Sequence, residues 1–439
     1  MYPSEKARKL NIPGIPLVRG PWFGDFRKAL EEANAKYANE PYIAAFFDPT
    51  VIIPSQCVEE LKNIPDTQIS ATGNMATRFS TSLAESGDLS KELAASVKYD
   101  LPRAVDDFFP DLQEEIQDAA DRSLPSSETW ERAEVQQDLV QIVGRVIGRI
   151  MVGAPLNRNS AWLNASIDHA IAVIMFSFWL RQFPDLLRPY IAPFMPYKRR
   201  LERSKRVIAA SVRPLIAQHS SRKTGIQAPP ESGRLVRWLL ERYEPKESPL
   251  VSSHIVKDHN TLCFAAIHGP NFLLVQALID LASYPQYVTP LRKEIDRELT
   301  SAPFEEWTRE TVERLEFLDA FCKESSRTNP QSVYIEDPGS FYPERWMRDR
   351  SNPHPDANFK FGSATLDSLT FGLGRHACPG RSLGTAMVKS ILAYIVSRWD
   401  VRLGGGQKGR PDNIHMDFQA MPPVPPLGNV HLEFKMRSG

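Results

Sequence analysis

The stretch FGLGRHACPGRSLG, residues 371–384, decides how the rest of the chain is interpreted. It places one cysteine, Cys378, among glycines and a proline, just before an apolar run that predicts a helix. The positive end of a helix dipole and its unpaired backbone N–H groups favour a thiolate at such a position. Gly372, Gly374 and Gly380 predict a backbone that a flat ligand can approach closely. The stretch therefore indicates a cysteine that is either a nucleophile or the single ligand of a metal cofactor.

The other cysteines offer no paired partner for Cys378. Cys57, Cys263 and Cys322 are scattered, with no C-x-x-C pair and no zinc-site spacing, which is typical of a reducing compartment. Any single cysteine could instead be a small buried apolar residue. A nucleophile also needs a nearby base, and His376 stands only two residues before Cys378. That placement suits a shared loop better than a catalytic dyad.

Composition limits the class of protein. The chain has 439 residues, 42% of them apolar, which allows a large core. Lys plus Arg and Asp plus Glu both number 53, so there is no basic surplus and we expect no nucleic-acid partner. No segment reaches the roughly 18 apolar residues of a membrane span, and the charged start is unlike a signal peptide. The longest apolar run, residues 170–180, predicts a core helix or a helix at a membrane surface.

The pattern along the chain predicts a mostly α fold with a minor β part. Residues 1–22 form a proline-rich N-terminal segment, and two short strands are expected in PYIAAFFDPTVIIP, residues 41–54, broken at Asp48-Pro49. Helical periodicity is clearest at 135–153, 204–219 and 254–285. With no clean linker, residues 23–439 are expected to form one large domain.

The spacing F-x-x-G-x-x-x-C-x-G, formed by Phe371, Gly374, Cys378 and Gly380, resembles the haem-binding loop of the cytochrome P-450 superfamily. The resemblance implies a cytochrome P-450 fold around a buried haem b, with Cys378 as the thiolate ligand of the iron. It also implies that Phe371 packs near the thiolate and shields it from water.

The same resemblance suggests which side chains meet the haem propionates. The family has an arginine two residues before the cysteine, but this chain has His376 there, with Arg375 before it. Which of the two meets a propionate stays open. By the same resemblance, Arg103 or Lys98 would make a second basic contact with a propionate. For each of them the alternative is a charge that faces solvent.

A second motif lies earlier in the chain. Glu324 and Arg327 are three residues apart on a predicted helix, so both point to one face. Alone they would indicate a surface ion pair of little energetic value. With Arg345 in FYPERW, residues 341–346, they resemble the buried triad that the family places behind the haem.

The third motif departs from the family. The family has an acid and a threonine in the long helix over the haem, whereas this chain has His268 at the acid position and Gly269 at the threonine position. Pro270 cannot donate to the carbonyl of Ala266, so we expect a kink there. Proton delivery would pass to Asn271, His268 or water, or the enzyme would protonate oxygen poorly.

The interval between Arg327 and Arg345 is also short. Relatives have several tens of residues more, in strands that line the substrate pocket. Either the chain is a natural shortened variant, or the sequence comes from a gene model that lost a segment. The start at Met1, in what resembles the hinge after a membrane anchor, favours the second interpretation.

The resemblance implies a haem-thiolate monooxygenase that inserts one oxygen atom of dioxygen into an apolar small molecule. Electrons would come from NADPH through a cytochrome P-450 reductase. FAAIH, His376 and PLRKEI resemble fungal members of secondary metabolism, for which terpenoid or similar substrates would fit. The alternatives are a non-oxygenating isomerase, dehydratase or cyclase-like enzyme, or an inactive shortened relative. The expected location is the endoplasmic-reticulum surface if a native anchor is missing, and otherwise the cytoplasm.

Overall fold

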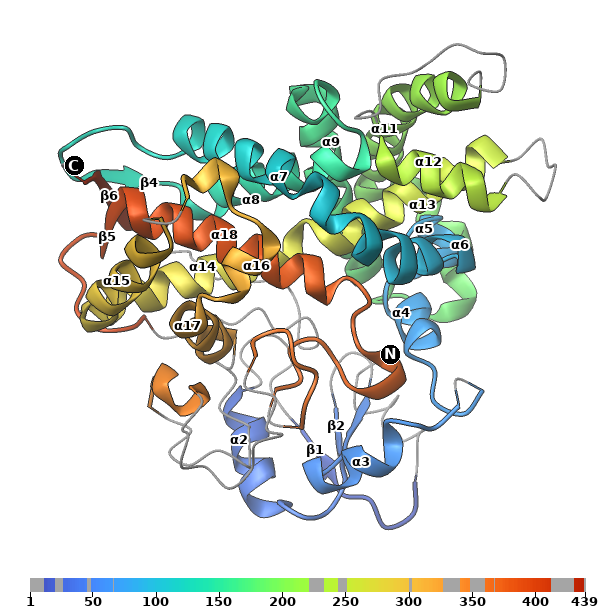
Figure 1. Cartoon of the computed structure of the whole chain (residues 1–439). Helices are drawn as coiled ribbons and strands as arrows, with labels where there is room; N and C mark the ends of the chain where they lie inside the picture. Colours follow the sequence, from blue (N-terminus) through green and yellow to red (C-terminus); the bar gives the residue numbers. More distant parts are fainter. Residues whose placement is uncertain are drawn as a thin grey trace.

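The computed structural model describes most of the chain. The described residues are 12–19, 27–45, 49–65, 67–220, 233–243, 251–299, 302–326, 340–347, 360–366, 368–411 and 430–437. A large helical part lies above a small N-terminal sheet in Figure 1, and the loop that carries Cys378 lies between them. This arrangement confirms the predicted mostly α fold. The single-domain organisation stays a prediction.

The N-terminal part contains a three-stranded sheet and short helices. In it β1 pairs with β2 in parallel, and β2 pairs with β3 antiparallel, as Ile43 opposite Val51 shows. The two strands expected on either side of Asp48-Pro49 are therefore confirmed. The elements are β1 (Leu17–Val18), α2 (Arg27–Lys36), β2 (Tyr42–Ala44), β3 (Thr50–Ile52), α3 (Val58–Leu61), α4 (Ala71–Arg78), α5 (Thr81–Ala84), α6 (Lys91–Ala95) and a π-helical turn (Ser96–Asp100).

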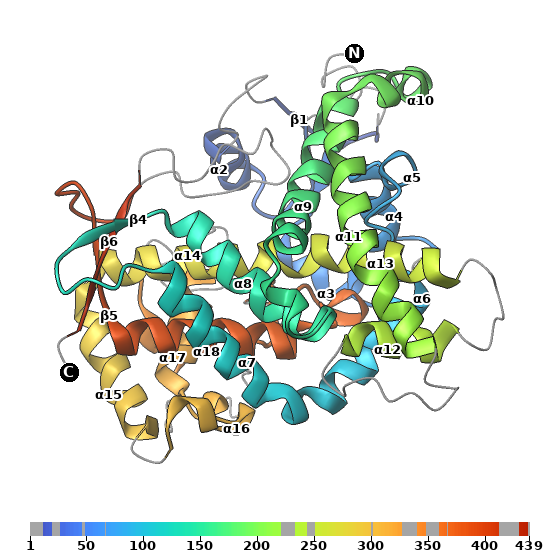
Figure 2. The same ribbon diagram turned by 90° about the horizontal axis from the view of Figure 1, so that it is seen from above.

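The helical part forms the bulk of the molecule, and Figure 2 shows its long helices crossing one another in layers. Its helices are α7 (Leu101–Ser123), α8 (Val135–Met151), α9 (Ser160–Leu180), α10 (Arg188–Ile191), α11 (Pro196–Ser220), α12 (Arg234–Tyr243), α13 (Val251–Ala266), α14 (His268–Ser283), α15 (Val288–Leu299), α16 (Arg309–Glu313), α17 (Glu316–Ser326) and α18 (Arg381–Arg398). A second antiparallel sheet has the order β4 (Glu131–Ala133), β6 (Leu432–Met436), β5 (Trp399–Leu403).

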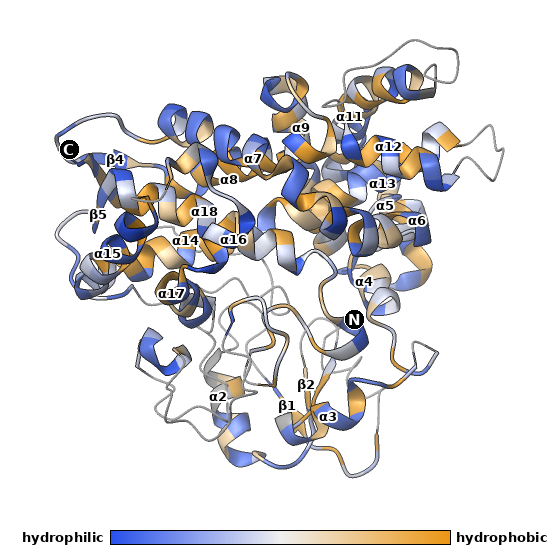
Figure 3. Cartoon of the chain, viewed as in Figure 1, coloured by the Kyte–Doolittle hydropathy of each residue, from blue (hydrophilic) through white to orange (hydrophobic). Residues whose placement is uncertain are grey.

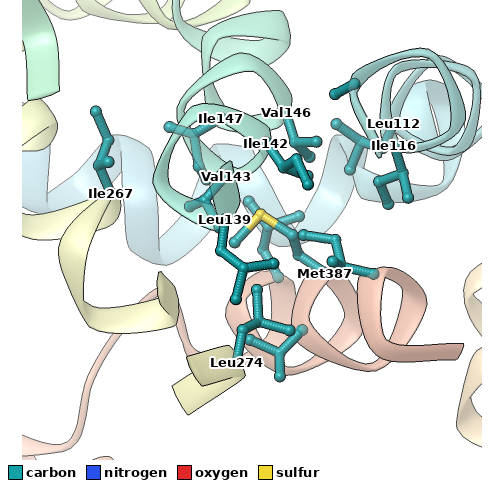
Figure 4. Close-up of a cluster of buried hydrophobic side chains, with 14 of the residues drawn as sticks. Leu112, Ile116, Leu139, Ile142, Val143, Val146, Ile147, Ile267, Leu274 and Met387 are labelled. Carbon is teal, nitrogen blue, oxygen red and sulfur yellow. The ribbon is translucent and has the colours of Figure 1, made fainter. Parts of the chain in front are cut away.

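The core forms where α7, α8, α14 and α18 pack together. The apolar stretches of α8, α14 and α18 lie at the centre of the helical part, whereas an outer helix such as α15 is mostly polar (Figure 3). Figure 4 shows Val146 of α8, Leu112 of α7 and Met387 of α18 in one cluster. A glycine also lets α8 approach α9 closely, because a Cβ at Gly148 would lie 2.7 Å from the ring of Trp162 in α9.

Two helical stretches among the described residues are long and apolar enough to cross a membrane by length and composition, a test that core helices also pass. They are Ser160–Leu180 and Val251–Ser283, and 67% and 44% of their apolar windows are buried in the fold. The second is also interrupted, since α13 ends at Ala266 and α14 begins at His268. The run 170–180 lies in α9, where most side chains are buried, as expected for a core helix.

Candidate functional site

The cysteine loop is closed by its own backbone. The N–H of Cys378 donates to the carbonyl of Phe371 at 2.7 Å. The carbonyl of Cys378 accepts from the guanidinium of Arg381, Nη1 to O 3.0 Å, and Arg381 is the first residue of α18. Cys378 itself is exposed. The predicted placement of this thiol just before a helix is therefore confirmed.

The glycines of the loop have a different role from the one expected. Gly372 and Gly374 both have positive φ, +71° and +59°, which glycine adopts without strain. A Cβ at Gly372 would lie 2.8 Å from the carbonyl of His376, and one at Gly374 would lie 2.7 Å from the carbonyl of Lys62. These two glycines thus allow the loop to turn and to pack on the chain itself. Gly380 has ordinary space, with Val97 3.6 Å from the position of a Cβ.

The four cysteines differ in exposure. Cys263 and Cys322 are buried and Cys57 is half-buried, so Cys378 is the exposed one. Burial raises the pKa of Cys263 to about 12, and it also raises the pKa of Cys322. A thiolate is therefore disfavoured at both buried positions.

Side chains around the loop support its backbone. Phe371 is half-buried and packs edge-on against Phe361, with ring centroids 5.5 Å apart, and Phe361 is fully buried. Arg375 is exposed and His376 half-buried. Neither arrangement singles out one of these two residues as the propionate contact, so that choice stays open.

Two members of the predicted triad, Glu324 of α17 and Arg345, lie together. Glu324 is 1% exposed, and its Oε2 lies 3.4 Å from Nε of Arg345. The carboxylate also accepts from the N–H of Tyr342 at 3.0 Å and from the indole of Trp346 at 2.6 Å. The third member of the predicted triad, Arg327, lies outside the described residues. Glu324 thus joins α17 to the segment 342–346.

Two further residues of α17 tie it to the segments around the cysteine loop, and no sequence pattern indicated either. Asp319 accepts from the N–H of Phe361 at 2.6 Å and from Nζ of Lys389 in α18 at 2.9 Å. Ser326 accepts from the hydroxyl of Thr370 at 3.1 Å. Because these partners are 42 to 70 residues away along the chain, only the folded structure brings them together.

The long helix is broken beside the expected oxygen site. The helix ends at Ala266, bends at Ile267 and restarts at His268, so the predicted kink is confirmed. Pro270 has no N–H for the carbonyl of Ala266, and the next bond, from the N–H of Asn271 to the carbonyl of Ile267, is long at 3.4 Å. The missing bond accounts for the break.

The side chains at the break point in different directions. Ala265 and Gly269 are exposed, and no atom lies within 4 Å of a Cβ built on Gly269. His268 instead reaches α9, with Nε2 3.0 Å from the carbonyl oxygen of Ile167. Asn271 is 1% exposed, and its Oδ1 has no hydrogen-bond partner among the described residues. The exposed positions Ala265 and Gly269 therefore carry no polar side chain.

The two candidate propionate contacts near α7 differ in position. Arg103 is exposed, two residues into α7. Lys98 is also exposed, and it follows Val97, which lies against Gly380 of the cysteine loop. The π-helical turn that carries Lys98 is therefore a neighbour of the loop, which favours Lys98 over Arg103.

Comparison with known proteins identifies the family. A sequence model described as cytochrome P450 matches residues 101–335 and 328–427, which is most of the chain. The chain belongs to the cytochrome P450 family. This confirms the predicted fold and the haem-thiolate monooxygenase class of fungal secondary metabolism.

The similar cytochrome P450 proteins are fungal. The cytochrome P450 monooxygenase ascG of Acremonium egyptiacum is 25% identical, with 99% of this chain and 93% of that protein covered. BOA7 of Botryotinia fuckeliana is 28% identical, with 99% and 90% covered. The gliF monooxygenase of Aspergillus fumigatus is 25% identical, with 93% and 89% covered.

The alignments also bear on the short interval of this cytochrome P450. The alignment with ascG has 500 positions, 61 more than the 439 residues of the whole chain, so those positions have no counterpart here. The two family matches meet at residues 328–335. The break in the family match therefore falls in the interval between Arg327 and Arg345 that the sequence pattern indicates is short.

Proposed function

We propose that Cys378 is the axial ligand of a haem with which this cytochrome P450 oxidises an apolar small molecule. The observation that carries the proposal is the exposed thiol of Cys378 on a loop that its own backbone and α17 fix in place. Exposed Ala265 and Gly269 on the helix pair fit a flat apolar group, since neither adds a bulky or charged side chain.

Each residue of the proposed haem site has a separate role. A bound haem supplies the activation of dioxygen, with one oxygen atom entering the substrate and the other leaving as water. Cys378 would bind the iron, and the start of α18 would stabilise its thiolate. Phe371, packed on Phe361, limits the access of water to the sulfur. Lys98 would neutralise a propionate, and electrons would come from NADPH through a reductase.

The spectrum of the reduced protein with carbon monoxide tests this proposal. Wild-type protein should show the strongly red-shifted Soret band of a thiolate-ligated haem. Cys378→Ser should lose the band, and the matched control Cys57→Ser should keep it, because Cys57 is half-buried on a different element. A red-shifted band in Cys378→Ser, with circular dichroism unchanged, would refute the assignment.

A second candidate function is an isomerase, dehydratase or cyclase-like reaction without net oxygen insertion. The specific observation that favours it is the absence of a hydroxyl at the exposed face of the helix break, where Ala265 and Gly269 stand. The two functions differ in whether an oxygen atom of dioxygen enters the product. Protein incubated with a reductase, NADPH, labelled dioxygen and a terpenoid panel should yield a product containing the label if it is a monooxygenase. Product formation without the label would support the second function.

We also propose that the protein works at a membrane surface, such as that of the endoplasmic reticulum, with the cytoplasm as the alternative location. A cluster of large apolar side chains, 37–81% exposed, lies between the end of α9 and the start of α11, and we call it the apolar tip. In Figure 2 this region, marked by α10, lies at the edge of the molecule. The apolar tip consists of Trp179, Phe183, Leu186, Leu187, Tyr190 and Phe194.

The charge next to the apolar tip fits an anionic lipid surface. Arg199, Arg203 and Arg206 are exposed on the first turns of α11. Exposed apolar and aromatic residues beside basic ones are typical of contacts with a lipid interface. The double variant Leu186→Glu with Phe194→Glu should therefore sediment less with phosphatidylserine vesicles than wild type does. Leu89→Glu, at an exposed leucine outside the tip, should not differ from wild type. Equal sedimentation of all three would exclude the tip as the contact.

A further inference from the structure

His268 has one nitrogen whose role the structure fixes. Its Nε2 lies 3.0 Å from the carbonyl oxygen of Ile167 in α9, which is 101 residues earlier in the chain. A carbonyl oxygen only accepts hydrogen bonds, so Nε2 must carry a hydrogen. Burial lowers the pKa of His268, which favours the neutral ring. In a neutral imidazole with hydrogen on Nε2, Nδ1 has a lone pair and is an acceptor.

The other ring nitrogen, Nδ1, makes no hydrogen bond with the described residues. Among the described residues, the bond to Ile167 is the one hydrogen bond that the ring of His268 makes. Nδ1 is also absent from the set of buried polar atoms without a partner, whereas Oδ1 of Asn271 belongs to that set. Nδ1 is therefore not fully buried.

Aromatic side chains stand near His268 along α13 and α14. Phe272 lies one turn later, with its ring centroid 6.4 Å from that of His268, and Phe264 packs edge-on against Phe79 at 4.8 Å. All three aromatic rings are half-buried, so each keeps accessible surface. Beside them, Gly269 has open space. Binding sites for small molecules typically combine such apolar walls with a few polar groups that fix orientation.

We propose that Nδ1 of His268 accepts a hydrogen bond from a hydroxyl or N–H group of the substrate. The bond between Nε2 and Ile167 fixes the ring for this purpose and ties the start of α14 to α9. The enzyme would then select an apolar molecule that carries one hydrogen-bond donor, and it would disfavour the same molecule with the donor blocked. This inference rests on the proposed oxidation of an apolar substrate.

A pair of probes tests the selection without turnover. The probes are 4-phenylphenol and its methyl ether, 4-methoxybiphenyl, and calorimetry gives the dissociation constant of each for the haem-loaded protein. We expect the phenol to bind about 3- to 10-fold more tightly than the ether, the range of one net hydrogen bond. Equal binding of the two probes, or binding of neither, would overturn the proposal.

Variants of His268 assign the selection to this residue. His268→Phe should bring the ratio of the two dissociation constants close to about 1. His268→Gln should restore part of the ratio, because an amide can donate to Ile167 and accept from the probe. The matched control is His254→Phe, at an exposed histidine of α13 whose ring lies 5.7 Å from Tyr243. It should keep the wild-type ratio. An unchanged ratio in His268→Phe would overturn the proposal.

A measurement on the wild-type protein keeps the test independent of how the variants fold. Nitrogen-15 NMR of labelled histidine distinguishes a ring nitrogen that carries hydrogen from one with a lone pair. We expect hydrogen on Nε2 of His268 and a shift of Nδ1 when the phenol, but not the ether, is added. Hydrogen on Nδ1 would overturn the inference. A missing carbon monoxide band would refute the haem assignment instead, so the two failures are distinguishable.

Discussion

The two sides of the proposed haem site are built differently. The cysteine side comprises residues 361–366 and 368–381 together with α17. Buried Glu324 and half-buried Asp319 support it by accepting from three separate segments. The helix-break side comprises residues 265–272, where the backbone lacks a hydrogen bond and the exposed positions carry only small side chains. On the proposed assignment, charged side chains support the loop of the thiolate ligand, whereas the side proposed to face oxygen presents exposed positions with small side chains.

The largest effect should follow from breaking the network on the cysteine side. Glu324→Ala removes a buried carboxylate that pairs with half-buried Arg345 and accepts from the indole of Trp346. We expect the free energy of unfolding to fall by about 3–5 kcal/mol, measured by urea denaturation. The control Glu316→Ala, at an exposed glutamate of the same helix, should change it by only about 0.5 kcal/mol. Similar losses in the two variants would contradict a special role for Glu324.

A smaller loss is expected at the second carboxylate of α17. Asp319→Asn keeps the shape but removes the charge that pairs with Lys389 and that accepts from the N–H of Phe361. We expect a loss of about 1.5–3 kcal/mol, the range of a charge-assisted hydrogen bond. Haem should also dissociate faster, as measured by transfer to apomyoglobin. Unchanged stability and haem retention would show that α17 does not support the loop.

Two buried histidines, His169 of α9 and His259 of α13, should make stability depend on pH. Burial lowers the pKa values of His169 and His259 to about 3 each, so both are neutral in the folded protein. The unfolded chain binds these protons below its ordinary histidine pKa, so stability is lost as pH falls through about 6.5. Between pH 6.5 and 5 we expect a loss on the order of 1 kcal/mol per pH unit for each histidine.

Urea denaturation at several pH values measures this slope. His259→Phe should reduce the slope by about half, because His169 is then the one buried histidine of the pair that still resists protonation. His254→Phe, at an exposed position, should leave the slope unchanged. A flat profile in the wild-type protein between pH 7 and 5 would show that the two buried rings do not resist protonation.

The smallest effect on stability is expected at the break itself. Gly269→Thr places a side chain in open space, so stability should change by less than about 1 kcal/mol. Gly148→Thr is the matched contrast, since its Cβ would lie 2.7 Å from Trp162, and overpacking there should cost about 1–3 kcal/mol. Equal losses in the two variants would show that position 269 is not open.

Gly269→Thr also restores the hydroxyl that the family has at this position. If proton delivery limits the enzyme, the fraction of oxidised NADPH that appears as product should rise in this variant. A fall in that fraction would instead indicate that the space beside Gly269 is needed for water or substrate.

Local signals account for what the sequence alone predicted. The loop around Cys378 and the residues Glu324 and Arg345 belong to short motifs, and the family resemblance of those motifs indicated that the two side chains meet. The break near Pro270 followed from one missing N–H group. By contrast, the contacts of Asp319 depend on segments far along the chain, and no periodicity reports them.

The glycines show where local reasoning fails. Gly374 was expected to clear space for a flat ligand, but its closest neighbour is the backbone of Lys62, on an element more than 300 residues earlier. The sequence cannot say which backbone will approach a glycine. The direction of His268 was equally hidden, because its partner is a main-chain carbonyl of α9.

X-ray absorption at the iron edge tests the ligation by Cys378 most directly, because it reports the atoms bound to the metal. In the haem-loaded wild-type protein we expect one sulfur atom in the first coordination shell. In Cys378→Ser we expect nitrogen and oxygen alone. A sulfur atom that persists in Cys378→Ser, or one that is missing from the wild-type protein, would contradict the assignment of Cys378 as the ligand.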